Sequence, residues 1–118
     1  MQKSSLNFEQ GDILVANITY SEHTGFKKRP ILVISNNNYN KTSGDLIVLS
    51  ISSQKPKVKY DIKLTNNDLI QGQLKAESKI LIDFITTLDK SLVDKKIAKI
   101  NNKKINEVKK RLKELFNL

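Results

Sequence analysis

The sequence has no cysteine and no tryptophan, and it contains only one histidine in 118 residues. Without cysteine there is neither a disulfide framework nor a metal site built on thiolates. One histidine among scattered carboxylates does not make a zinc site, so we expect no metal and no cofactor. A glycine-rich phosphate loop, the HExxH pattern and a spaced Ser/His/Asp set are also absent, which excludes the enzyme classes built on them.

Long hydrophobic runs are missing as well. No segment approaches the roughly 18 apolar residues of a membrane-spanning helix, and the N-terminal residues 1–5 precede no apolar signal core. We therefore expect a soluble, cytoplasmic protein without a membrane partner. The length favours one domain over residues 1–118 with a single modest core.

The charge is strongly one-sided, with a formal net charge of +9 and a pI of about 9.8. Such a balance favours a polyanionic partner, with a solvated lysine-rich surface as the alternative. Of the 21 basic residues only Arg29 and Arg111 are arginine. Arginine binds carboxylate or phosphate through a planar, bidentate fork that lysine lacks. Arg111 follows Glu107 by four positions on an expected helix, which indicates an ordinary surface pair and leaves Arg29 as the candidate of interest.

Short apolar runs between turn residues predict a small β-rich protein. We expect strands at residues 11–18, 29–35, 46–52, 58–64, 79–87 and 96–100. A polar loop is expected at 19–28 and a single helical turn at 66–70. A final helix begins at Asn101 or Asn102, and its apolar face, which includes Phe116 near its end, packs on the sheet. The expected class is mainly β (α+β): a small, strongly bent antiparallel sheet or barrel with short helices and a C-terminal helix.

Polar residues at the ends of the expected strands are the candidates for chemistry. Pro30 holds Arg29 in an extended conformation at the start of one strand, and Ser52 and Ser53 end another. Asp83 is embedded among apolar strand residues. Each has a plain structural explanation: a surface arginine at a strand end, serines bonded to local backbone, and a partnered carboxylate in a half-buried strand. Together an arginine, a hydroxyl and a carboxylate beside basic loops suit phosphoryl chemistry without a metal.

A series of short motifs gives a more specific indication. In chain order they are Gly11-Asp12-Ile13, Lys28-Arg29-Pro30-Ile31-Leu32-Val33-Ile34-Ser35-Asn36, Val48-Leu49-Ser50-Ile51-Ser52-Ser53, Asp61-Ile62-Lys63-Leu64, Gly72-Gln73-Leu74-Lys75-Ala76-Glu77-Ser78 and Thr86-Thr87-Leu88-Asp89-Lys90. Their order and spacing from about residue 9 to 116 resemble the MazF/PemK family of toxin endoribonucleases. Each motif is loose by itself, but several motifs in register are specific.

The resemblance implies a fold and a reaction. The fold would be an SH3-like barrel with added helices, assembled as a homodimer. The reaction would be cleavage of single-stranded mRNA at a short sequence without a metal, by attack of the 2′-hydroxyl on the adjacent phosphate. The products would carry a 2′,3′-cyclic phosphate and a 5′-hydroxyl. Arg29 would neutralise charge on the phosphorane, and Ser52 would stand in for the catalytic threonine of the family.

The same resemblance implies residues that contact RNA and a protein partner. His23, Lys27 and Lys28 would bind backbone phosphates from the loop, although a lone histidine in a loop usually has no such role. Further RNA contacts would come from Ser53, Lys55 and Asp83. An acidic antitoxin would occupy the same basic groove, with its apolar side chains in pockets at the dimer interface.

The sequence also departs from the family pattern. Ser52 keeps the hydroxyl of threonine but loses the methyl group that restricts its rotamer. Thr86 and Leu81 stand where relatives carry arginine, so the group that deprotonates the 2′-hydroxyl stays open, with Asp83 matching an acidic position. Three alternatives stay open too: a non-catalytic nucleic-acid-binding barrel, a gyrase-poisoning toxin of the same fold, and a copy that binds antitoxin but does not cut. RNA specificity would lie in loops 21–28 and 53–58.

Overall fold

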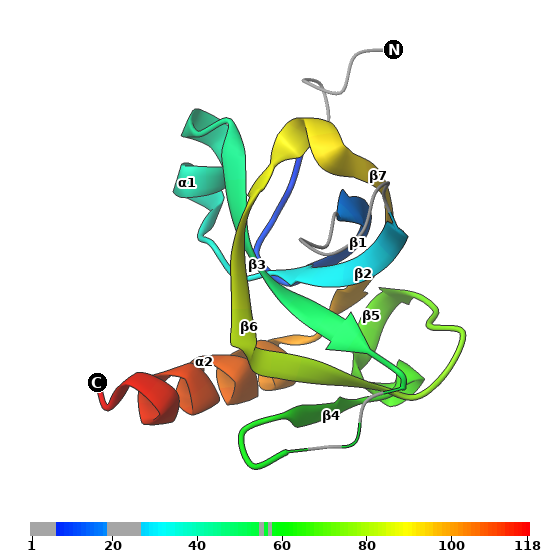
Figure 1. Cartoon of the computed structure of the whole chain (residues 1–118), viewed down its shortest axis with the longest axis vertical. Coiled ribbons are helices and arrows are strands. Elements are labelled where there is room, and N and C mark those ends of the chain that lie inside the picture. Colours follow the sequence, from blue (N-terminus) through cyan, green and yellow to red (C-terminus); the bar gives the residue numbers. More distant parts are fainter. Residues whose placement is uncertain (1–6, 19–26, 55, 57) are drawn as a thin grey trace.

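The computed structural model describes residues 7–18, 27–54, 56 and 58–118. These residues form one antiparallel, strongly curled seven-stranded sheet in the spatial order β4-β6-β3-β2-β1-β7-β5 (Figure 1). The strands are β1 (Asp12–Ile18), β2 (Lys27–Val33), β3 (Asp45–Ser52), β4 (Ile62–Leu64), β5 (Leu69–Gly72), β6 (Ser78–Asp89) and β7 (Val93–Ile100). The helices are α1 (Asn37–Thr42) and α2 (Asn102–Phe116), with 3-10 turns η2 (Asn66–Asp68) and η3 (Lys90–Leu92). The predicted class, a small mainly-β fold with a C-terminal helix, is confirmed.

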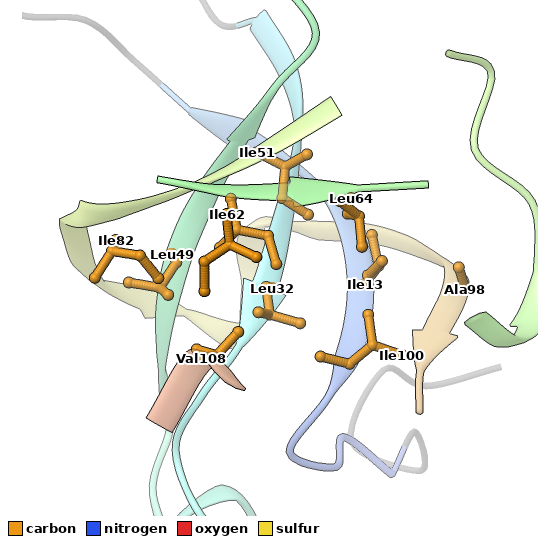
Figure 2. Packing of buried hydrophobic residues seen from close by; sticks show 11 residues of the cluster. Ile13, Leu32, Leu49, Ile51, Ile62, Leu64, Ile82, Ala98, Ile100 and Val108 are labelled. Carbon is orange, nitrogen blue, oxygen red and sulfur yellow. The ribbon is translucent and has the colours of Figure 1, made fainter. Parts of the chain in front are cut away.

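Both faces of the curled sheet carry a hydrophobic core. Figure 2 shows the helix-side core, in which Leu32, Leu49 and Ile82 of the sheet meet Val108 of α2. The η3-side core lies on the other face and consists of Phe8, Leu14, Ala16, Ile31, Val33, Leu46, Val48, Leu88 and Val93. Because successive residues of a strand point to opposite faces, two cores explain why β2 and β3 read as continuous apolar runs.

Strand β6 bends sharply and serves both cores (Figure 1). Its pairing with β3 steps from Leu49↔Ile85 to Ser50↔Leu81, so residues 82–84 lie outside the regular ladder. Such a bulge bends a strand and increases its local twist. As a result Ile80 packs in the helix-side core, whereas Leu88 packs in the η3-side core.

Helix α2 begins where its sequence predicts. The side chain of Asn101 caps it by accepting a hydrogen bond from the backbone N–H of Lys104 at 2.8 Å. Val108 is buried in the helix-side core, but Phe116 is 54% exposed, so its predicted packing on the sheet is wrong. Phe116 is the last residue of the helix, which ends with Asn117 in the left-handed conformation. Within the described ranges no helix is long and apolar enough to cross a membrane.

Arg111 does more than the expected surface pairing with Glu107. Its Nη1 donates to the backbone carbonyls of Tyr60 at 3.2 Å and Asp61 at 3.4 Å. The Glu107 carboxylate lies 4.0 Å from its Nη2, a longer distance than the 3.4 Å between its Nε and Glu114. Arg111 therefore ties α2 to the turn that precedes β4.

That turn shortens the strand expected at 58–64. The Asp61 carboxylate accepts from the backbone N–H of Val58 at 3.1 Å, and the N–H of Asp61 donates back to the Val58 carbonyl at 3.0 Å. A side-chain hydrogen bond of this kind offers the backbone an alternative to the sheet ladder. Only Ile62–Leu64 remain as β4, and Val58 lies exposed.

Other element boundaries differ as well. The helical turn expected at 66–70 ends at Asp68, and the chain continues as β5, which was not predicted. Gly72 ends β5 with φ of +77°, and a Cβ there would lie 2.0 Å from the carbonyl oxygen of Ile97. Glycine is therefore required for β5 to pack this closely on β7. Strand β7 begins at Val93, three residues before the expected start.

Candidate functional site

Arg29 and Ser52 lie at neighbouring positions on one face of the sheet. The ladder of β2 with β3 runs from Val33↔Val48 to Ile31↔Ser50, and Arg29 and Ser52 each lie two residues beyond its last pair. Because side chains alternate along a strand, Arg29 and Ser52 lie on the same face as Ile31 and Ser50. On its other side β2 pairs Arg29 with Ala16 of β1. Strand pairing thus brings together the two residues predicted to be catalytic.

The surroundings of Arg29 are partly apolar. Ala16 and Ile31, which share its face, belong to the η3-side core, so Arg29 lies at the margin of that core. The residue is half-buried and its Nε is buried. Pro30 follows Arg29 and has no backbone N–H to donate; it pairs with Val15 of β1. A charged group at such a margin interacts more strongly with an anion than one in open water does.

Two lysines continue the line that Arg29 and Ser52 begin. Ser52 pairs with Lys79 of β6, and Lys79 pairs in turn with Lys63 of β4. We call Arg29, Ser52, Lys79 and Lys63 the basic row. Neither lysine was predicted to belong to the site. Along the chain β6 is separated from β3 and β4 by other elements, and the register in which it pairs with them is not visible in the sequence.

Lys28 and Ser53 lie on the opposite face from the basic row. They line a cavity of about 460 Å³, whose other walls are Val15, Pro30, Ile51, residues 73–76, Ser78, Asp94, Lys95 and Ile97. The Nζ of Lys28 contacts the Asp94 carboxylate at 3.2 Å. Lys27 and Lys28 belong to β2 rather than to the expected loop. The predicted RNA-binding residues are therefore divided between two faces.

Asp83 lies apart from the Arg29–Ser52 pair. It belongs to the bulged residues of β6, four positions along the strand from Lys79, and it is exposed. The strand is half-buried, as expected, but the Asp83 carboxylate itself is exposed, because the bulge interrupts the alternation of faces. Phe84 beside it is 46% exposed. His23 and Lys55 lie outside the described residues.

Two carboxylates, those of Glu9 and Asp12, lie near the other end of β1. Asp12, fully buried, accepts a hydrogen bond from the N–H of Glu9 at 2.8 Å and lies 3.1 Å from the Nζ of Lys96. A hydrogen bond from Lys99, together with its charge, holds the pKa of Glu9 below its ordinary value. Partial burial acts to lower the pKa of Lys99, but its hydrogen bond to Glu9 and the charge of Asp12 outweigh burial, so that pKa is raised.

These groups do not make a metal centre. Among the described residues no three or more histidine, cysteine, aspartate or glutamate side chains are grouped to hold an ion. Asp12 pairs with Lys99 across the ladder, whereas Ala16, four residues on, pairs with Arg29. The carboxylates of this cluster therefore lie away from Arg29 along β1.

Comparison with known proteins gives consistent results. A family model described as PemK-like, MazF-like toxin of type II toxin-antitoxin system matches residues 9–116. The chain is 31% identical over 104 residues to an endoribonuclease MazF from Staphylococcus saprophyticus, covering 84% of this chain and 82% of the relative. A solved MazE-MazF structure from Deinococcus radiodurans is 22% identical, with a TM-score of 0.78 and coverage of 96% and 99% of the two chains. A mycobacterial endoribonuclease solved in complex with its cognate antitoxin is 16% identical, with a TM-score of 0.77 and coverage of 94% and 96%.

Proposed function

Because the chain belongs to the PemK-like, MazF-like toxins of type II toxin–antitoxin systems, we propose that it is an endoribonuclease that cleaves single-stranded mRNA at a short sequence. The observation that carries the proposal is that Arg29 and Ser52 lie on one face of adjacent strands, each two residues beyond the Ile31↔Ser50 pair. A guanidinium and a hydroxyl on the same face of adjacent strands are suited to hold the same phosphate group. An mRNA substrate would place the activity in the cytoplasm.

The proposed reaction needs no group beyond the protein and the RNA. The 2′-oxygen attacks the adjacent phosphorus while its proton passes to a base, and the bond from phosphorus to the 5′-oxygen breaks. The leaving 5′-oxygen takes up a proton, so the products are a 2′,3′-cyclic phosphate and a 5′-hydroxyl. Arg29 stabilises the charge that develops on the phosphate oxygens, because its fork donates two parallel hydrogen bonds. Ser52 donates its hydroxyl proton to a non-bridging oxygen.

We also propose an acidic antitoxin as the protein partner. The net charge of +9 favours an acidic segment. Two of the similar structures were solved as toxin–antitoxin complexes. An antitoxin that covered the basic row would exclude RNA from Arg29 and Ser52 by competition.

A homodimer is the assembly we propose. Large apolar side chains are exposed at the bend of β6 and at the end of α2, namely Phe84, Ile85, Phe116 and Leu118. Helix α2 contacts β6 through the helix-side core, so these two elements are neighbours (Figures 1 and 2). Exposed apolar groups on neighbouring elements are typical of a protein interface.

The first experiment is cleavage of a long unstructured RNA by purified protein in EDTA, with the ends mapped by sequencing and end chemistry. We expect discrete cuts that leave cyclic phosphate and 5′-hydroxyl ends. Arg29→Ala and Ser52→Ala should each lower the cleavage rate by about 100-fold to 1000-fold, the usual loss for one group that stabilises a transition-state oxyanion. Lys110→Ala, which removes one exposed charge from α2, is the matched control and should leave the rate unchanged.

Two outcomes would contradict the proposal in different ways. If both variants at the site cut as fast as the unaltered protein, the assignment of Arg29 and Ser52 would be wrong. If RNA or DNA bound but no RNA was cut, the protein would be a nucleic-acid-binding barrel or a gyrase poison. A supercoiling assay with DNA gyrase would separate these two.

A further inference from the structure

We infer that Lys79 and Lys63 together bind the RNA phosphate next to the one that is cleaved, so that the backbone runs across the strands along the basic row. The inference rests on the proposed function for the identity of the anion. The geometry comes from strand pairing: Ser52 opposes Lys79, and Lys79 opposes Lys63. Adjacent strands lie about 4.8 Å apart, so Ser52 and Lys63 are separated by about 10 Å in the direction across the sheet.

The two lysines are held on the same face by the residues beside them. Ile62 and Ile80 oppose one another and both belong to the helix-side core. Figure 2 shows Ile62 in that core. Lys63 and Lys79 follow by alternation on the opposite face, the face of Ser52. Neither strand is able to turn its lysine away without withdrawing an isoleucine from the core. The core therefore enforces the proximity of the two charges.

Two like charges directly opposed on antiparallel strands destabilise a sheet. Among the described residues, the one carboxylate paired with Lys63 is that of Glu77, at 3.8 Å. Both side chains of this pair are mostly exposed, so the pair contributes little. Lys79 makes no salt bridge with any residue that the structure describes. An anion between the two ammonium groups would convert this repulsion into two charge-assisted hydrogen bonds.

Protection of a sheet edge is the competing explanation, and it accounts for only half of the pair. Edge strands often carry lysine to discourage pairing with other chains, and β4 is at one edge of the sheet. Strand β6 lies between β4 and β3, so Lys79 is an interior position with no edge to protect. A lysine there, beside Ser52, is better explained by a ligand on that face.

The two lysines bind one phosphate, which is adjacent in the RNA to the phosphate that is cleaved. Arg29 and Ser52 hold the phosphate that reacts, and Lys79 and Lys63 hold the adjacent phosphate one step further across the sheet. The ammonium groups bind charge and not bases, so the pair contributes affinity and positioning without sequence preference. Its effect should therefore appear in RNA binding and in KM more than in kcat.

The test uses Lys63→Gln, Lys79→Gln and the double variant, with Lys110→Gln as the matched control. RNA affinity is measured against salt concentration in Ser52→Ala protein, which is expected not to cut. Loss of one phosphate contact should reduce the slope of log affinity against log salt by about 0.7 in the double variant, the value for single-stranded nucleic acid. Lys110→Gln should leave the slope unchanged. An equal slope in the double variant and the control would overturn the inference.

A second measurement does not depend on RNA. At matched ionic strength, inorganic pyrophosphate should raise the melting temperature of the unaltered protein and of Lys110→Gln more than that of the double variant, in which only Arg29 and Ser52 remain to hold a phosphate. Lys79→Gln alone should melt higher than the unaltered protein in low salt, because one of two repelling charges is gone. Equal stabilisation of all variants by pyrophosphate would overturn the site. If pyrophosphate acts through Lys79 but no RNA is cut, the anion site stands and the nuclease proposal fails. If all variants cut RNA with the same KM, the nuclease proposal stands and the anion site fails.

Discussion

The two faces of the sheet at the junction of β2 and β3 differ, although the residues that line them alternate along the same strands. One face carries the basic row. The other carries the cavity of about 460 Å³, where Lys28 is already paired with Asp94 and the walls include Val15, Pro30 and Ile51. Arg29 and Lys28 are adjacent in sequence, as are Ser52 and Ser53, yet each pair is split between the faces. The period of two in a strand, and not closeness in sequence, decides which residues share a site.

The difference predicts which basic residues act on the phosphate. On the cavity face the charge of Lys28 is offset by Asp94, and Lys75 and Lys95 share the walls with apolar side chains. On the row face Ser52 pairs with Lys79, and Arg29 lies two residues beyond the last pair of β2 with β3. The row face combines an arginine with the hydroxyl of Ser52, so the proposed chemistry is assigned to it.

Exchanging Lys28 and Arg29 is the most direct test of the difference between the two faces. The double variant Lys28→Arg with Arg29→Lys keeps composition and net charge but moves the guanidinium to the cavity face. We expect the cleavage rate to fall by about 100-fold, because a lysine cannot reproduce the bidentate fork on the face of Ser52. Single-turnover cleavage measures the change, and circular dichroism checks the fold. Unchanged cleavage would mean that the face of the arginine is irrelevant.

Gly72→Ala tests whether the cavity face is independent of the basic row. A Cβ at residue 72 would lie 2.0 Å from the Ile97 carbonyl oxygen, so β5 must move away from β7. We expect a loss of about 2–4 kcal/mol in the free energy of unfolding, measured with urea. Gly44→Ala is the matched control, because a Cβ there meets no atom within 4 Å. Cleavage per folded molecule should stay constant at low temperature; a larger fall would show that the two faces are coupled.

Glu9→Gln should have the smallest effect on stability. It tests a lysine that is paired with a carboxylate, Lys99, for comparison with Lys63 and Lys79, which oppose one another in the basic row. The pKa of Glu9 is lowered in the folded state, so its ion pair with Lys99 stabilises the fold above the ordinary pKa of about 4.5 and is lost as the pH falls through the folded pKa. Glu9 is half exposed, so we expect a loss of only a few tenths of a kcal/mol at pH 7 in low salt. The loss should shrink as the pH is lowered through the folded pKa of Glu9. A destabilisation that does not change with pH would assign the effect to packing and not to charge.

The sequence was sufficient to predict the pair at the centre of the proposed site. Arg29 before a proline and Ser52 at a strand end were identified from residue type and position, and consecutive strands usually pair, which puts the two on neighbouring strands. That Arg29 and Ser52 share a face follows only from the register of β2 with β3. This register depends on the path of the chain through α1, which the sequence does not reveal. The C-terminal helix was predictable because its cap and apolar period are local features.

The parts that could not be predicted depend on contacts between distant segments. Lys79 and Lys63 become neighbours through pairing of β6 with β4, across a stretch that contains η2 and β5. The position of Asp83 depends on a bulge, which shifts the faces of a strand without any change in its composition. The alternation through residues 58–64 predicted a strand, but the Asp61 side chain closes a turn there, and a local hydrogen bond outweighed the pattern.

The bend of β6 has a consequence for how the protein unfolds. Because this single strand supplies Ile80 and Ile82 to one core and Leu88 to the other, neither core is able to open while the other stays intact. The chain should therefore melt as one cooperative unit, with a calorimetric enthalpy equal to the van't Hoff enthalpy. The amide protons of β6 should exchange with solvent only through global unfolding, and their protection should report the full stability of the molecule.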